Sequence, residues 1–179
     1  MAGHGAKDKS DHFYFLTSEG SREHPKQGGI DWAILGKPLA RIPGRVILFL
    51  DACRSGGLVT ETVVPNDELA RRLFSRGGGV MVFSASKGWQ GSMESPDIEG
   101  GVGVFTYALT RGLGPEAKTA DANGNGFVEF MELVDYVRVT VDRGDWEKDE
   151  VAREKLKGHQ TPWLSRKELF GDLPIARVN

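Results

Sequence analysis

The chain has a single cysteine, Cys53, among its 179 residues. One thiol excludes an internal disulfide framework and leaves catalysis, weak metal binding or packing as the roles open to it. The sequence also lacks any apolar run near the roughly 20 residues that a membrane-spanning helix needs, so we expect no membrane partner. The first residues lead directly into charged sequence and not into an apolar segment, and the sequence indicates no compartment.

Excess charge of either sign is also missing, since the net charge is −2 at pH 7. Nucleic-acid-binding proteins present a basic surface, so we expect no nucleic-acid partner. Hydrophobic residues make up 39% of the chain and charged residues 27%. These values and the length are typical of an ordinary globular domain with a sizeable core.

What the sequence does contain is a nearly unbroken apolar run at residues 45–50, which predicts a strand buried on both faces of an α/β sheet. A second apolar strand is predicted at residues 80–83. The first run ends at Asp51-Ala52-Cys53-Arg54-Ser55-Gly56. A carboxylate and the only thiol therefore come at the carboxyl end of a core strand, where open α/β sheets place their chemistry.

The other predicted elements alternate strand and helix, as in a βαβ sheet. Glycine and lysine in residues 1–10 favour a loop, and Pro38 argues against one straight helix within residues 30–42. The remaining expectations are strands at 12–17 and, at a sheet edge, 161–164, and helices at 67–75, 102–113 and 129–142.

A thiol peptidase needs a base that accepts the thiol proton and N–H donors that stabilise the oxyanion. His4, between Gly3 and Gly5, lies 49 positions before Cys53 (53 − 4). A histidine about 50 residues before the cysteine is the spacing of the known caspase signature. His12, within a predicted strand, is the alternative base.

On its GHG and DACRSG boxes, the chain resembles the caspase-like cysteine peptidases, and is closer to their bacterial and metacaspase branch than to true caspases. The resemblance covers roughly residues 3–164 and implies a three-layer caspase-like α/β sandwich. It implies that Cys53 is the nucleophile and His4 the general base. The backbone N–H groups of Gly5 and Cys53 would form the oxyanion hole.

In the caspase-like fold the catalytic histidine follows the third strand, whereas only three residues precede His4 here. We therefore expect the first strands of the fold to be missing, with residues 1–165 as a partial peptidase domain. Residues 166–179 would be a tail packed on the domain or trailing it. The strand at 45–50 would then lack a neighbour, and its exposed apolar edge would invite association.

Two acidic residues stand where caspases hold an acidic substrate side chain. Caspases recognise P1, the residue whose carbonyl is attacked, with a glutamine two positions before the nucleophile and an arginine in a later loop. This chain has Asp51 at the first position and Glu94 near the second. The reversed charge predicts cleavage after Arg or Lys, as in metacaspases.

Residues 121–132 fit the twelve-residue EF-hand pattern D-x-[DN]-x-[DN]-G-x₅-E. The motif occurs once, and the predicted helix before it ends near residue 113, so a turn that caps the next helix remains an alternative. The ligand residues for Ca²⁺ would be Asp121, Asn123, Asn125, Phe127 and Glu132.

The leading hypothesis is a cysteine endopeptidase that acts on polypeptides through a His4/Cys53 dyad and needs no cofactor for its chemistry. One alternative is a caspase-like scaffold without activity. The other is a calcium-binding interaction module that acts through residues 121–132.

Overall fold

The protein is described from a computed structural model in which the chain forms two compact units. The first comprises Met1–Gly91 with Trp163–Ser165, and the second comprises Ser92–Pro162 with Arg166–Asn179. Cys53 and the helix predicted at 67–75 lie outside the described residues. The structure describes residues 2–10, 12–52, 80–87, 90, 92–95, 98, 101–144, 147, 150, 154, 157–165 and 172–178.

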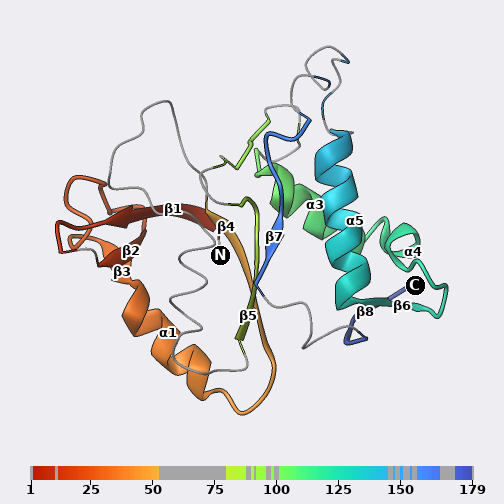
Figure 1. The fold of residues 1–179 in the computed structure, drawn as a ribbon, viewed down its shortest axis with the longest axis horizontal. Helices are drawn as coiled ribbons and strands as arrows, with labels where there is room; N and C mark the ends of the chain where they lie inside the picture. Colours follow the sequence, from red (N-terminus) through yellow and green to blue (C-terminus); the bar gives the residue numbers. More distant parts are fainter. Residues whose placement is uncertain are drawn as a thin grey trace. The chain divides into compact units, whose positions relative to one another are not determined.

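The first unit contains a six-stranded sheet with the order β3-β2-β1-β4-β5-β7 (Figure 1). Strands β1, β4 and β5 run parallel, and the remaining pairs are antiparallel. β7 pairs with β5 at the end of this order, so the predicted edge strand is confirmed. The strands are β1 (Ala2–Lys7), β2 (Phe13–Leu16), β3 (Gly29–Asp31), β4 (Val46–Ala52), β5 (Val80–Ser84) and β7 (Trp163–Leu164).

The two predicted apolar strands are neighbours inside this sheet, which confirms the α/β class. β4 and β5 pair in parallel from Val46↔Val80 to Leu50↔Ser84. All of β5 is buried, whereas Leu50 is the first fully buried residue of β4. The core cluster of Leu50, Val80 and Val82 is covered by Phe15, Leu35, Leu39, Val46, Leu48 and Trp163.

The amino-terminal segment is a strand, and the prediction of a loop there was wrong. β1 pairs with β2 along residues 4–7 and with β4 at Ala2↔Asp51 and Gly3↔Ala52. Its glycines give little local strand signal, so hydrogen bonding to strands on both sides defines it. The neighbour of β4, expected before Met1, is therefore supplied in part by β1.

Helix α1 (Trp32–Arg41) is a single helix that contains Pro38, where the sequence argued against one. Proline deprives the carbonyl four residues earlier, that of Ile34, of its helical partner. Both Pro38 and Ile34 are exposed, so water can hydrate this carbonyl. Leu35 and Leu39 pack on the core cluster and hold the helix in place.

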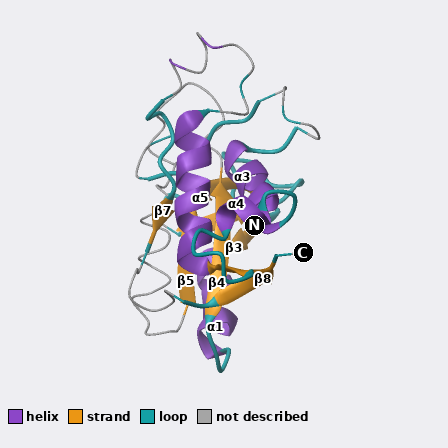
Figure 2. Ribbon diagram, turned by 90° about the vertical axis from the view of Figure 1, so that its right-hand side faces the viewer, coloured by secondary structure: helices purple, strands orange, loops and turns teal. Residues whose placement is uncertain are grey.

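The second unit is built around α5, which Figure 2 shows with α3 and α4. The two longer helices and their inward residues match the prediction: Phe130, Leu133, Val134, Val137 and Val141 of α5 are all buried. The elements are α3 (Val104–Leu113), α4 (Ala117–Ala120), β6 (Phe127–Glu129), α5 (Phe130–Arg143) and β8 (Pro174–Arg177).

Two elements of this unit change how residues 121–132 are interpreted. Helix α3 ends at Leu113, as predicted, but a further short helix, α4, which the sequence did not indicate, ends directly before Asp121. The carboxyl-terminal strand β8 pairs antiparallel with β6, which forms part of the loop. In the described part of the chain, no helix has the length and apolar character needed to cross a membrane.

Candidate active site

His4 lies in β1, between β2 and β4. Its partner on β2 is Leu16, and the residue before it, Gly3, is paired with Ala52 at the end of β4. His4 is therefore next to the carboxyl end of the parallel strand β4, where the sequence predicted the chemistry.

Asp51 shares a face of the sheet with His4. It pairs with Ala2, and positions 2 and 4 of one strand project to the same side because side chains alternate. The Asp51 side chain is buried, with 3% of the residue exposed. The sheet therefore brings together two of the predicted site residues, a histidine and a buried acid.

Gly3 occupies a position that leaves no room for a side chain. A Cβ atom there would lie 2.8 Å from Cζ of Phe15, and the backbone φ of 149° is one that other residues rarely adopt. Phe15 is paired with Gly5 and packs against the core cluster. Gly3 thus lets an aromatic ring cover the face of β1 opposite His4.

His12, the alternative base, is at the other end of the hairpin. It lies beyond the pair Lys7↔Phe13, whereas β4 is paired with residues 2 and 3. Its imidazole Nδ1 is 3.6 Å from Oδ2 of Asp8, and its side chain is 61% exposed. This placement favours His4 over His12 as the residue next to the end of β4.

Glu94 belongs to the second unit, and its side chain is exposed. Its backbone forms an isolated bridge with Gly103. The preceding residue, Met93, donates its N–H to Oε1 of the buried Gln160 at 2.7 Å and accepts the N–H of Val104 at 2.9 Å. The segment that carries Glu94 is therefore held on two sides.

Residues 121–132, here called the acidic loop, are organised by Asp121. Its carboxylate accepts the N–H groups of Gly124 (2.8 Å), Asn125 (3.1 Å) and Gly126 (2.9 Å). Gly124 and Gly126 have φ values of 72° and 88°. These contacts wrap the backbone around one carboxylate in a turn that favours glycine.

Glu129 completes this loop, although the sequence interpretation missed it. Its carboxylate accepts the side-chain amides of Asn123 (3.0 Å) and Asn125 (2.5 Å). Glu132 accepts the N–H groups of Asn123 and Glu129, both at 3.0 Å. Counting from Asp121, Glu129 is position 9 of the EF-hand pattern, a ligand position that the spacing could have revealed.

The two glutamates of the acidic loop influence each other's protonation. A hydrogen bond from Glu132 lowers the pKa of Glu129, while burial and then this same bond raise the pKa of Glu132. No group of three or more His, Cys, Asp or Glu side chains in the described residues is arranged to hold a metal ion. An EF-hand loop, however, also takes ligands from asparagine and from a backbone carbonyl.

A cavity of about 470 Å³ lies among α3, α4 and α5 in the second unit. On its wall, Glu116 accepts hydrogen bonds from the side chains of both Arg111 and Tyr136. Burial, followed by the bond to Glu116, raises the pKa of Tyr136 to about 12. These groups therefore form a closed network in the cavity wall.

Comparison with known proteins agrees with the fold and the sequence boxes. The caspase domain family matches residues 1–174. No protein of curated function matches the chain significantly. Because the match spans nearly all of the sequence, the chain belongs to the caspase domain family, a family of cysteine peptidases. The predicted family and caspase-like fold are confirmed, and the bacterial and metacaspase branch stays a prediction.

Proposed function

We propose that this chain is a cysteine endopeptidase in which Cys53 is the nucleophile and His4 the general base. The register of β1 against β4 is the observation that carries the proposal. Gly3 pairs with Ala52, the last residue of β4. His4 follows Gly3 in β1, and Cys53 follows Ala52 in the sequence.

Chain connectivity limits the separation of these two residues. Paired strands lie about 4.8 Å apart, and consecutive Cα atoms are about 3.8 Å apart. The Cα atoms of His4 and Cys53 are therefore no more than about 12 Å apart. This upper limit on the distance supports a His4/Cys53 dyad. It results from the pairing of Gly3 with Ala52, which are 49 positions apart in the sequence (52 − 3).

In the proposed reaction, the imidazole of His4 takes the proton of the Cys53 thiol, and the thiolate attacks the carbonyl carbon of the scissile peptide. The N–H groups of Gly5 and Cys53 stabilise the oxyanion. Collapse of the tetrahedral intermediate expels the amine, which takes the proton from His4. Water, deprotonated by His4, then hydrolyses the thioester and restores the thiol.

Asp51 is proposed to select Arg or Lys at P1. A buried carboxylate on the His4 face would pair with a basic side chain and would leave an acidic one unpaired. Glu94 is proposed as a second acid that favours a basic substrate. Both roles are separable from the chemistry, because neither carboxylate takes part in proton transfer.

The test is labelling and turnover with peptide substrates and electrophiles that carry Arg, Lys, Asp or Leu at P1. We expect labelling by the arginine electrophile, a loss of at least about 1,000-fold in kcat/KM for Cys53→Ala and His4→Ala, and a smaller loss for His12→Ala. Asp51→Asn and Glu94→Gln should reduce the preference for Arg over Leu. Glu154→Gln, an exposed acid in the second unit, is the control.

Several outcomes would contradict the proposal. Faster turnover after Asp than after Arg would refute the specificity. Labelling that survives Cys53→Ala would refute the nucleophile, and an unlabelled wild type would favour the scaffold alternative.

We propose as a second candidate function that the acidic loop binds Ca²⁺. The favouring observation is that side-chain oxygen atoms of Asp121, Asn123, Asn125, Glu129 and Glu132 all accept hydrogen bonds from N–H groups within the loop. Within the described residues, none of the three carboxylates forms an ion pair with Lys or Arg. The pairing of β6 with β8 supports the loop where a second EF-hand would otherwise do so.

Calorimetry with Ca²⁺, and with Mg²⁺ for comparison, tests this candidate. We expect Ca²⁺ to release heat and to raise the melting temperature, and Asp121→Ala to abolish both effects. Asp135→Ala, which removes an exposed acid from α5 outside the loop, should retain them. No heat with the wild type, or equal heat with Asp121→Ala, would eliminate the site.

A further inference from the structure

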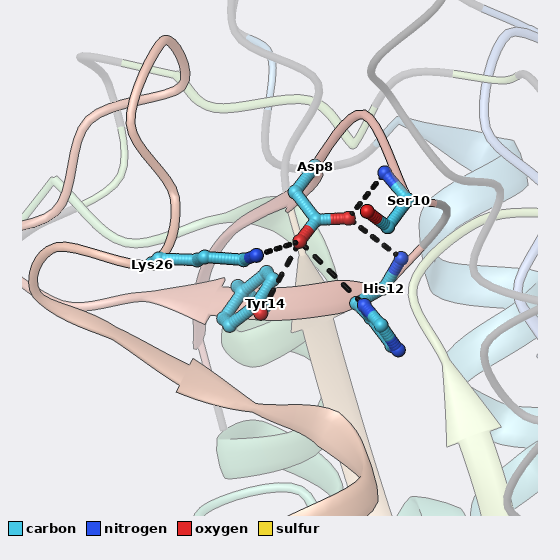
Figure 3. Close-up of polar contacts among 5 residues, drawn as sticks. All are labelled: Asp8, Ser10, His12, Tyr14 and Lys26. Carbon is cyan, nitrogen blue, oxygen red and sulfur yellow. Dashed lines mark hydrogen bonds and ion pairs between the residues drawn. The ribbon is translucent and has the colours of Figure 1, made fainter.

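Asp8, at the turn between β1 and β2, contacts donor groups of Ser10, His12, Tyr14 and Lys26 (Figure 3). Its Oδ1 accepts the N–H of Ser10 at 2.8 Å and that of His12 at 3.0 Å. Its Oδ2 accepts the Tyr14 hydroxyl at 3.4 Å and pairs with Lys26 Nζ at 3.1 Å. Only 8% of the Asp8 side chain is exposed.

These contacts tie together three separate parts of the hairpin region. Ser10 and His12 belong to the turn, Tyr14 lies in β2, and Lys26 comes from the loop that leads to β3. The turn is closed further by the Asp8 N–H, which donates to the carbonyl of His12 at 3.0 Å. One carboxylate therefore fixes where β2 begins relative to β1.

The sequence of β1 by itself specifies this register weakly. The strand is Ala-Gly-His-Gly-Ala-Lys, and its one described, fully buried apolar side chain is Ala6. Glycine-rich strands are prone to register slips, and a slip of one residue turns every side chain to the opposite face of the sheet. The pairs with β4 at Ala2 and Gly3 are few compared with the four formed with β2.

His4 is at the end of the hairpin ladder, opposite Leu16. In the observed register its position shares a face with Asp51, and the opposite face is closed at Gly3 by the Phe15 ring. A slip of one residue would exchange these faces.

We propose that Asp8 is a positioning residue for His4: it fixes the register of the β1–β2 hairpin and thereby the face on which the imidazole lies. This inference rests on the proposed role of His4 as the base. Asp8 itself touches neither the substrate nor the reacting atoms in this proposal.

Two substitutions distinguish the effect of Asp8 on the strand register from the effect of its negative charge. Asp8→Asn keeps an oxygen that can accept the N–H groups of Ser10 and His12, whereas Asp8→Ala removes it. We expect Asp8→Ala to lower kcat at least about tenfold with KM within about twofold, because a misplaced base slows the chemical step. Asp8→Asn should stay within about threefold of the wild type.

Alkylation of Cys53 by iodoacetamide as a function of pH supplies a readout that lost stability alone would not move. A thiol paired with an imidazolium ionises well below the ordinary pKa of about 8.5. In Asp8→Ala, as in His4→Ala, the pH at which the alkylation rate is half-maximal (the midpoint) should rise toward that value by about one pH unit or more. Val137→Ala, which weakens the core of the second unit, controls for stability and should keep the wild-type midpoint.

The outcomes distinguish this inference from the proposed function. If the wild type shows no lowered midpoint and no turnover, the proposed function fails and this inference fails with it. If the wild type shows both and Asp8→Ala leaves both unchanged, only the inference is overturned. Equal losses in Asp8→Asn and Asp8→Ala would also overturn it, because charge and not register would then be the cause.

Discussion

The turn at Asp8 and the acidic loop at Asp121 share one local arrangement but differ in the charges around it. In each, one aspartate accepts N–H groups from residues two to five positions later in the chain. At Asp8 the charge is met by Lys26, whereas the loop adds Glu129 and Glu132 with no described Lys or Arg partner.

The partners of the two turn carboxylates, and not the turns themselves, distinguish the two roles that we propose for them. A compensated carboxylate stabilises one backbone arrangement and suits a structural role. A group of uncompensated acids stores repulsion that a cation would relieve, which suits ion binding.

The largest expected effect concerns one glycine of the β1–β2 hairpin and one glycine of the acidic loop. Gly3→Ala should lower the free energy of unfolding by about 2 kcal/mol or more, since the new Cβ would collide with the Phe15 ring and the backbone would be strained. Gly126→Ala in the acidic loop would also strain the backbone, but no atom lies within 4 Å of the new Cβ. It should therefore lower the free energy of unfolding by only about 1 kcal/mol.

Urea unfolding measures both values, and Gly44→Ala is the matched control. Gly44 has a φ of 159°, close to that of Gly3, but nothing lies within 4 Å of its Cβ position. Replacing Phe15 with Leu should restore part of the stability lost in Gly3→Ala. Equal costs at Gly3 and Gly44 would show that the ring contact contributes nothing.

A smaller effect is the opposite response of the two regions to pH. Burial raises the pKa of Asp8, but the hydrogen bonds from His12, Lys26 and Ser10 outweigh it and hold the pKa well below its ordinary value of 3.8. Its contribution to stability is therefore complete above about pH 4 and is lost as the pH falls. Burial and Glu129 raise the pKa of Glu132 above 4.5, so its contribution is complete below pH 4.5 and is lost as the pH rises.

Melting temperatures between pH 3 and pH 7 check these directions. The melting temperature of Asp8→Asn should be furthest below that of the wild type near pH 7, and this difference should shrink toward pH 3. The melting temperature of Glu132→Gln, which resembles the protonated acid, should improve relative to the wild type as the pH rises. Parallel curves for either variant would show that the group contributes no pH dependence.

The family and much of the fold could be predicted from short stretches of sequence. The GHG and DACRSG boxes identified the family, now supported by a match over residues 1–174. Apolar periodicity predicted β4, β5, α3 and α5, because burial is recorded in the spacing of apolar residues. The acidic loop was recognised from the spacing of its oxygen donors.

Other features depend on pairings that local sequence does not record. β1 resembled a loop because glycine carries no strand signal, and helix α1 continues through Pro38 because its other face packs on the core. Glu129 falls at a position that the D-x-[DN]-x-[DN]-G-x₅-E pattern leaves open, so the pattern alone does not single it out.

The sequence by itself determined the nucleophile and base candidates, the parallel core strands and the acidic loop, since each is written in residue type and spacing. Only the tertiary structure decided that His4 shares a face with Asp51, that Phe15 closes the other face at Gly3, and that Asp8 joins the turn to Lys26. Strand register and long-range hydrogen bonds form only when distant segments of the chain pair. The sequence pattern of one segment does not specify which other segment it will pair with, or in which register.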